Sequence, residues 1–341
     1  MEKILSFFVI IIFKCTFLVS ALMSQDIHFS QFYASPLSLN PAETGFFDAN
    51  WRFSNNYRTQ WSAIGVPFRT ISVGFDKPFR LNSKSDLGLG VFVVNDNSGH
   101  SKLTVNKIFL STSYIRHIKK YHSLSFAIQV GYVFKSFSGG GLTFPDQFNP
   151  GTGVFDPELQ TNFRDYDNDL NYPDINAGIS YSYNSGNIRP YAGVSIFHLN
   201  TPKESFLNSS ESKLPIRMVF NGGLNISLSD NLVLNPNFLT MYNKKASDWI
   251  FGSLLYYYIP NKNIFRSIFV GLHTRTALHN FDAVITTAGV NIFGFEIGVS
   301  YDINISHLRA ATKYRGAIEL SLIYKDISKK PIKITIPCDR Y

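Results

Sequence analysis

From residue 50 to residue 325 the chain alternates apolar with polar or small side chains, with a period of two, in one short segment after another. This period places the apolar side chains on one face of a β-strand and the others on the opposite face. Such segments, each about ten residues long, are typical of strands that cross a membrane as a closed barrel. A soluble β-sandwich shows the same alternation with its apolar face inward, so further observations must decide. The clearest alternation is in 126–134, 295–302 and 316–324.

We identify fourteen candidate strands in this part of the chain. Small changes in their boundaries would make the number twelve or sixteen. The segments show no internal repeat and no linker, so they predict a single domain. The predicted strands are 50–58, 67–76, 86–94, 103–117, 121–137, 173–184, 188–200, 215–228, 231–242, 247–259, 264–275, 282–293, 295–304 and 313–325.

The connections between these segments alternate between short and long. Bacterial outer-membrane barrels have short turns on the periplasmic side and longer loops outside. When the count starts in the periplasm, short turns follow the even-numbered segments, except for 77–85, and the loops 138–172, 201–214 and 305–312 follow odd-numbered ones. The pattern predicts an all-β, antiparallel transmembrane barrel over 50–325, with a periplasmic N-terminal leader at 25–49 and a periplasmic C-terminal tail at 326–341.

Composition agrees with a barrel in a membrane. Aromatic residues make up 15% of the chain and charged residues 16%, whereas proteins on average carry about 25% charged residues. After the N-terminal segment, no stretch approaches the length of an apolar spanning helix. The net charge of +8 is scattered, which argues against a nucleic-acid partner and favours anionic lipid or an acidic protein. Aromatic residues predicted to lie at the membrane interfaces are Trp51, Tyr57, Trp61 and 256–258.

Residues 1–24 predict a signal peptide, and therefore a protein exported to the cell outer membrane. Lys3 precedes an apolar run at 4–13, which suits a signal core and is shorter than the roughly 20 apolar residues of a spanning helix. A retained membrane anchor is the alternative. Cleavage would remove Cys15 and leave Cys338 as the single cysteine, so no internal disulfide could form.

Few residues suggest chemistry. The Asp-rich run 165–169 opens like a calcium-binding loop, but Leu170 and Asn176 stand where an EF-hand has Gly and Glu. Eight His are spread over the chain without zinc-site spacing. A hydrolase would need Ser, His and a third group adjacent on the barrel wall, and the sequence singles out no serine for this role. We therefore predict no enzyme activity, no metal and no cofactor.

The interior of the predicted barrel has two interpretations. Its inward-facing polar side chains could line an aqueous pore. They could instead form a packed, hydrogen-bonded interior that the leader plugs. The residues concerned are Gln129, Glu296, Asp302 and Glu319.

Several motifs in the chain resemble one known family. The leader carries His28-Phe29-Ser30-Gln31-Phe32-Tyr33, Ser35-Pro36, Leu39-Asn40-Pro41-Ala42 and Thr44-Gly45; later come Tyr57-Arg58-Thr59-Gln60-Trp61, Gly74-Phe75-Asp76-Lys77-Pro78, Tyr301-Asp302-Ile303-Asn304 and 316–322. These motifs resemble the PorP/SprF family of type IX secretion membrane proteins of the Bacteroidetes. The ending Cys338-Asp339-Arg340-Tyr341 departs from the family's pattern, because Asp339 replaces Pro. Between about 100 and 290 the chain resembles the family in its general pattern rather than in specific motifs.

The resemblance implies a non-enzymatic outer-membrane component of the type IX secretion system. Such proteins link the periplasmic machinery to the outer membrane, or they support the export and surface anchoring of a large secreted adhesin used in gliding motility. Its implied partners are outer-membrane lipid and either machinery proteins or an adhesin. A porin or hydrophobic-solute transporter on the same barrel is the alternative.

The leader is our first candidate for a partner-binding segment, either in the periplasm or in the barrel lumen. Its composition favours an extended strip rather than a helix. Capping or plugging of the barrel is the alternative role for the same residues. The candidate partner-binding residues are Phe29, Gln31, Phe32, Tyr33, Asn40, Pro41, Tyr57, Arg58, Trp61 and Cys338.

Overall fold

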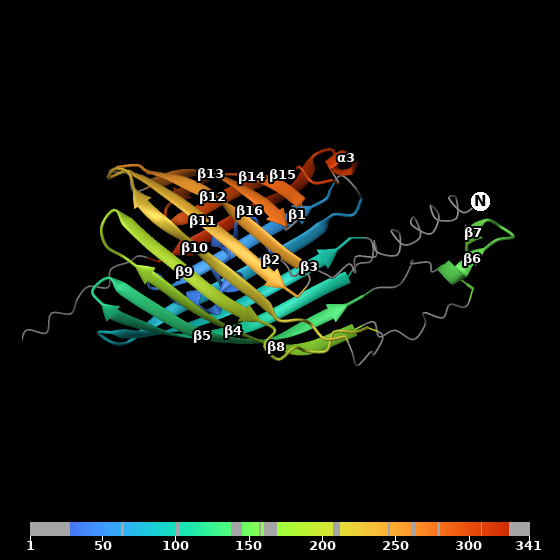
Figure 1. Cartoon of the computed structure of the whole chain (residues 1–341), viewed down its shortest axis with the longest axis horizontal. Helices are drawn as coiled ribbons and strands as arrows, with labels where there is room; N and C mark the ends of the chain where they lie inside the picture. Colours follow the sequence, from blue (N-terminus) through green and yellow to red (C-terminus); the bar gives the residue numbers. More distant parts are fainter. Residues whose placement is uncertain are drawn as a thin grey trace, which may run out of the picture.

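Fourteen antiparallel strands close into one barrel (Figure 1). The computed structural model describes residues 28–62, 65–99, 103–137, 145–156, 158–159, 169–206, 212–244, 246–260, 264–277, 280–307 and 309–326. The predicted signal peptide and Cys338 lie outside these residues, as does most of the Asp-rich run 165–169. Each strand pairs with its sequence neighbours, and β1 closes the ring by pairing with β16.

Each of the fourteen predicted segments overlaps one barrel strand. The strands are β1 (Arg52–Gln60), β2 (Phe68–Asn82), β3 (Ser85–Ser98), β4 (Leu103–Lys119), β5 (His122–Ser136), β8 (Asp169–Tyr183), β9 (Ile188–Phe197), β10 (Arg217–Ser227), β11 (Leu232–Asn243), β12 (Ala246–Tyr258), β13 (Phe265–Ala277), β14 (Asn280–Ile292), β15 (Phe295–Asn304) and β16 (Arg315–Lys325). The loops carry the two-stranded sheet of β6 (Phe148–Asn149) and β7 (Val154–Phe155), with η3 (Pro145–Gln147) and α3 (Arg309–Thr312).

The long turn predicted at 77–85 is wrong. β2 continues through Pro78 to Asn82, and β3 begins at Ser85. Pro78 pairs with β3, but the ladder between β1 and β2 ends at Arg52 and Asp76, so Pro78 has no partner on the β1 side. A proline is tolerated where its missing N–H faces no neighbouring strand. All the turns after even-numbered strands of the ring are therefore short.

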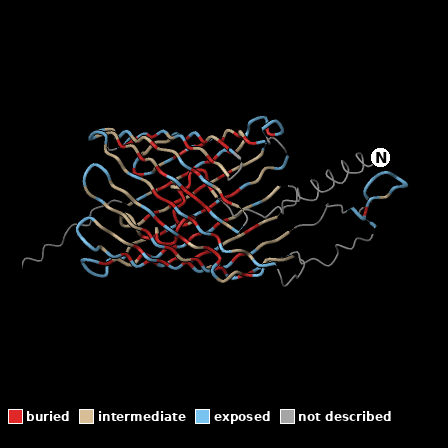
Figure 2. The backbone as a smooth tube through the Cα atoms, viewed as in Figure 1, coloured by how far each residue is buried: buried red, intermediate tan, exposed pale blue. Residues whose placement is uncertain are grey.

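Apolar side chains face outward and polar ones inward. On β5, Phe126, Ile128 and Val130 are about half exposed, whereas Ala127 and Gln129 between them are buried. This arrangement is the reverse of a soluble sandwich and is the one a membrane barrel needs. Figure 2 shows the buried residues gathered in the middle of the barrel. Among the described residues no helix is long and apolar enough to cross a membrane.

Candidate functional site: a plug in the barrel lumen

Residues 29–45, which we call the plug, lie inside the barrel (Figure 1). The plug folds as three short helical turns, η1 (Phe32–Ala34), α2 (Pro36–Leu39) and η2 (Pro41–Glu43). The extended strip predicted for it is wrong. Pro36 and Pro41 each open a turn, where a fixed φ favours helix and no N–H is needed. The Asn40 side chain caps the last turn by accepting a hydrogen bond from the Ala42 amide at 2.9 Å.

The N-terminal end of the plug is held by a buried carboxylate. Glu319 of β16 accepts hydrogen bonds from the backbone amides of Ser30 at 2.6 Å and Gln31 at 2.8 Å. The Gln31 side chain donates to the Glu319 carbonyl and accepts from the Ser321 hydroxyl. Hydrogen bonds to a charged acceptor are stronger than neutral ones, so this contact fixes the start of the plug.

Two guanidiniums and two carboxylates surround the Ser30 hydroxyl. Arg58 of β1 pairs with Glu319 and lies 3.3 Å from Asp302 of β15. Arg275 of β13 lies 3.0 Å from the same Asp302 carboxylate. The Ser30 hydroxyl donates to Asp302 at 2.8 Å and accepts from Arg58 at 2.7 Å. Arg275 also pairs with Asp282 of β14 at 2.6 Å. Because an isolated buried charge is costly, it matters that both guanidiniums have carboxylate partners here.

The middle of the plug contacts the opposite side of the barrel through Asn40. Its Nδ2 donates to the Ile179 carbonyl and to the Ser180 hydroxyl, both at 3.1 Å. Two glycines make this approach possible. A Cβ on Gly178 would stand 1.9 Å from Asn40 Oδ1, and one on Gly193 would stand 2.5 Å from its Nδ2. Strands β8 and β9 therefore need glycine at these positions to admit the plug.

The C-terminal end of the plug is fixed by a third set of contacts. The Gly45 amide donates to Asp76 at 2.8 Å, and Asp76 forms a buried ion pair with Arg52 at the same distance. Gly45 has a φ of +65°, which favours glycine. The Thr44 carbonyl accepts from the Ser113 hydroxyl of β4 at 2.6 Å. The chain is thus held directly before it enters β1.

Glu43 is the half-buried carboxyl of the plug. It accepts a hydrogen bond from the Ser180 hydroxyl at 2.7 Å. Burial raises the pKa of the Glu43 carboxyl above its usual range, and the Ser180 hydrogen bond and Arg52 act in the opposite direction. The neutral acid is therefore favoured more strongly here than in water.

Apolar contacts complete the seat of the plug. Phe32 and Leu39 belong to one buried cluster with side chains of β9, β10, β11, β12 and β14, and Leu37 belongs to a second with side chains of β3, β4, β5 and β8. The lumen is thus packed by plug side chains on both sides. Burial of each such side chain contributes on the order of 1.5–3 kcal/mol.

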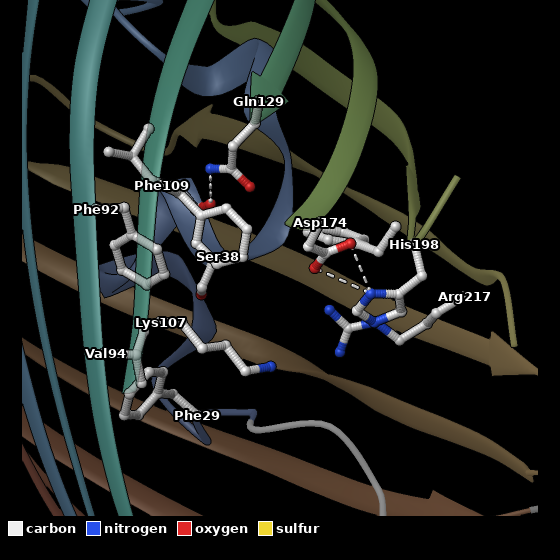
Figure 3. A pocket seen from close by; sticks show the side chains of 12 residues that line it. Phe29, Ser38, Phe92, Val94, Lys107, Phe109, Gln129, Asp174, His198 and Arg217 are labelled. Carbon is white, nitrogen blue, oxygen red and sulfur yellow. Dashed lines mark hydrogen bonds and ion pairs between the residues drawn. The ribbon is translucent and has the colours of Figure 1, made fainter. Parts of the chain in front are cut away.

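A small cavity of about 30 Å³ remains beside the plug (Figure 3). Lys107 and Arg217 reach it from two strands, and Asp174 binds His198 at 3.0 Å on its wall. Ser38 of the plug lies among them. A volume of this size holds one or a few water molecules. Apart from this small cavity, the polar side chains of the wall here therefore lie close against the plug.

The predicted site residues fall into three groups. Four plug residues, Phe29, Gln31, Phe32 and Asn40, are buried against the barrel, and Tyr33 stacks on His273 with ring centroids 6.1 Å apart. A second protein could reach them only if the plug left the lumen. Arg58 binds the plug, whereas Tyr57 faces outward from β1. Trp61 directly follows β1, has a φ of +59° and contacts the Phe68 ring.

Several residues that hold the plug were not expected from the sequence. Gly178, Gly193 and Arg275 gave no local signal, because their roles depend on contacts between distant parts of the chain. Ser30 and Asp76 stand in the motifs that resemble the family, but their contacts with each end of the plug were not expected. Gln129 was expected to face inward, and its side chain donates a hydrogen bond to the Leu37 carbonyl of the plug. Among the interpretations left open for the interior, a packed and plugged lumen is the one found.

One arrangement bears on the hydrolase hypothesis. At the short-turn end, His117 of β4 lies 2.8 Å from the Ser123 hydroxyl and 3.1 Å from the Asp86 carboxylate. The sequence had singled out no serine, and the structure thus identifies one that could be tested. In the part of the chain that the structure describes, no three His, Cys, Asp or Glu side chains are grouped to hold a metal ion.

Comparisons with known proteins agree with this architecture. The family model "Type IX secretion system membrane protein PorP/SprF" matches residues 21–324. The Ralstonia pickettii toluene transporter TbuX is similar in structure, with a TM-score of 0.50 and 11% identity over 86% of this chain and 93% of that one. The CymD monoaromatic hydrocarbon channel gives a TM-score of 0.51 and 12% identity over 86% and 92%. At this identity the likeness concerns the fold alone. No curated protein matches the chain.

Proposed function

Since the chain belongs to the PorP/SprF family of type IX secretion system membrane proteins, we propose that it is a non-enzymatic component that binds other proteins of this system and has no open path for solutes. The family and the barrel architecture place it in the outer membrane. The observation that carries the rest of the proposal is the plug. Its two ends and its middle are each bonded to the wall, so the lumen is occupied along its length.

In this proposal the short-turn end of the barrel faces the periplasm. The last residues of the plug lie at that end, where Gly45 bonds to Asp76 and β1 begins, so the segment that joins the plug to β1 would be the part nearest to periplasmic proteins. The first residues of the plug lie deeper, because Ser30 bonds to Arg58 and Asp302 near the long-loop ends of β1 and β15. The loops at the other end face outside, where a secreted protein would pass or be anchored. The barrel would then either link the periplasmic machinery to the outer membrane or support the export and anchoring of one large adhesin.

The alternative is a porin or hydrophobic-solute transporter. Its support is the fold shared with a toluene transporter and a monoaromatic hydrocarbon channel. Against it stands the packing of Phe32, Leu37 and Leu39 across the lumen. A conducting state would require these buried side chains to leave their clusters, at a cost of several kcal/mol.

The test is deletion of the gene in its host, followed by mass spectrometry of the surface and secreted proteins. Loss of one large surface protein would assign the barrel to that client, and loss of all type IX cargo would assign it to the core machinery. Unchanged secretion would contradict the proposal. Complementation with the full-length chain provides the control.

A second measurement separates the two functions directly. The purified protein in a planar bilayer should not conduct ions, whereas a variant lacking residues 29–45 should open a pore, because removal of the plug leaves the lumen of a fourteen-stranded barrel. Equal conductance of the two proteins would favour the solute channel.

A further inference from the structure

The outer wall of the barrel is hollowed over β3, β4, β5, β8 and β9, and the hollow has a volume of about 490 Å³. Two adjacent rows of outward side chains form it. One row is Thr112, Ile128, Ala177 and Ile196, and the next is Tyr114, Phe126, Ile179 and Val194. In the first row the small Thr112 and Ala177 alternate with isoleucines, which produces a trough. Its volume is within the range of ligand pockets, roughly 300–1,000 Å³.

The trough can hold only an apolar group. Its wall is formed mainly by aliphatic and aromatic side chains, and Ile128, Phe126 and Ile179 are each about half exposed on the outer face. In an outer-membrane barrel this face is in contact with lipid. A hydrocarbon chain is therefore the group that the surroundings supply.

One end of the trough is polar. Ser85, two residues before Leu87 of the trough on β3, is fully buried although its neighbours on the same face point outward. Its hydroxyl lies 2.9 Å from the Tyr114 hydroxyl and accepts a hydrogen bond from Arg116 at 2.8 Å. Arg116 follows Tyr114 by two residues on the outer face of β4, so their Cα atoms lie roughly 7 Å apart.

The charge at this end is positive. Arg116 is exposed, and its bond to Ser85 uses one of the five N–H donors of a guanidinium. Lys84, Lys119 and Lys120 are exposed on the turns beside it. The adjacent carboxylate on β3, Asp86, lies on the opposite face of the strand from Ser85, bonds to His117 and forms an ion pair with Arg80. A phosphate placed outside Arg116 would thus meet several cations, and the guanidinium geometry suits a phosphate.

We propose that this trough is a binding site for one anionic phospholipid, with an acyl chain along Ile128 and Ile179 and the headgroup phosphate against Arg116. The trough supplies the apolar lining that a chain needs, and the Arg116–Ser85–Tyr114 cluster supplies donors where the apolar lining ends. The site is independent of the plug and of the secretory role proposed above.

Native mass spectrometry of the delipidated full-length protein tests the site. Phosphatidylglycerol would be titrated against phosphatidylethanolamine with the same acyl chains, because the two differ in net charge. One phosphatidylglycerol should bind per barrel in preference to phosphatidylethanolamine. Equal binding of the two lipids would overturn the headgroup assignment.

Two variants and two matched controls locate the lipid. Arg116→Gln should weaken phosphatidylglycerol binding about tenfold, because it removes a charge-assisted contact, and Ala177→Phe should abolish binding by filling the trough. Arg266→Gln and Ala288→Phe make the same changes on β13 and β14, on the far side of the ring. β13 and β4 are seven strands apart in the ring of fourteen.

The outcomes separate cleanly. Losses in Arg116→Gln and Ala177→Phe with unchanged controls would support the site, provided that both variants run as folded barrels in unboiled gels. Equal affinity of Arg116→Gln and Arg266→Gln, or of Ala177→Phe and Ala288→Phe, would overturn it. A dimer that Ala177→Phe abolishes would assign the trough to a second copy of the chain and would also overturn the proposal.

Discussion

The backbone amide of Ser30 donates a 2.6 Å hydrogen bond to the carboxylate of Glu319, 289 residues later in the chain. The contact joins the first residues of the plug to β16, the strand that closes the ring by pairing with β1. Seating of the plug and closure of the barrel therefore depend on the same strand. A plug that is not seated would leave Glu319 and Arg58 facing an empty lumen.

Glu319→Gln should loosen the plug. The substitution removes the charge that pairs with Arg58 and accepts the two amides, and removal of one partner from a buried ion pair costs about 3–5 kcal/mol. Hydrogen exchange measured by mass spectrometry should show the amides of the plug exchanging at least about a hundredfold faster. The strands should keep their protection.

The matched control for that measurement is Asp230→Asn, which removes an exposed carboxylate in the turn before β11. It should leave the exchange of the plug unchanged. If Glu319→Gln exchanges like this control, the carboxylate does not hold the plug.

Gly178→Ala should displace Asn40. The new Cβ would stand 1.9 Å from Asn40 Oδ1, and overpacking of this kind costs about 1–3 kcal/mol. The free energy of unfolding should fall in Gly178→Ala but much less in Gly151→Ala, where the nearest atom would be 3.2 Å away. The double variant Gly178→Ala/Asn40→Ala should lose less than the sum of the two single changes. Strict additivity would mean that Asn40 and Gly178 do not interact.

The strands were predictable, whereas the seat of the plug was not. Alternation in β5 or β15 repeats every two residues, so a short window of sequence reveals it. The segment from Pro78 to Asn82 was missed because a proline normally ends a strand, and its unpaired position is visible only once the register of β1 is known. The sequence alone could not indicate that β1 begins at Arg52, opposite Asp76.

The plug shows more clearly that contacts between distant residues cannot be predicted from a local sequence pattern. The motifs of the plug were recognised in the sequence, but the segment was expected to be extended. Local signals for helical turns were present, because Pro36 and Pro41 occupy first helical positions and Asn40 caps the last turn. The bonds of the plug run to residues such as Ser180 and Glu319, which are 137 to 289 residues away along the chain. Contacts of this range leave no periodic pattern in a sequence. From the sequence alone, the packed interior therefore remained one of two interpretations, and the contacts across the closed barrel decide between them.

Glu43→Gln should make the seating of the plug less dependent on pH. Burial raises the pKa of this carboxyl, so the seated plug binds its proton more tightly than the free plug does. Seating should then be strongest below the ordinary pKa of glutamate and weaken as the pH rises through the raised value. Arg52 and Lys325 oppose this shift and Asp76 adds to it. Exchange of the plug amides, measured from pH 4 to pH 8 after correction for intrinsic rates, should become faster as the pH rises in the native protein and change less in Glu43→Gln. Parallel curves would rule out this role for Glu43.

Arg58→Ala should destabilise the plug and Tyr57→Ala should not, although the two residues are adjacent and both were expected to bind a partner. Arg58 points inward and contacts Ser30, Asp302 and Glu319, whereas Tyr57 points outward between Ile71 and Leu320. Arg58→Ala leaves two buried carboxylates with one fewer cation and should destabilise the plug by about 3–5 kcal/mol. Tyr57→Ala removes only a side chain that faces lipid, so the exchange of the plug should not change. Channel recordings should follow the same division, with openings in Arg58→Ala and none in Tyr57→Ala. Openings in Tyr57→Ala alone would mean that the wall, rather than the plug, controls passage through the barrel.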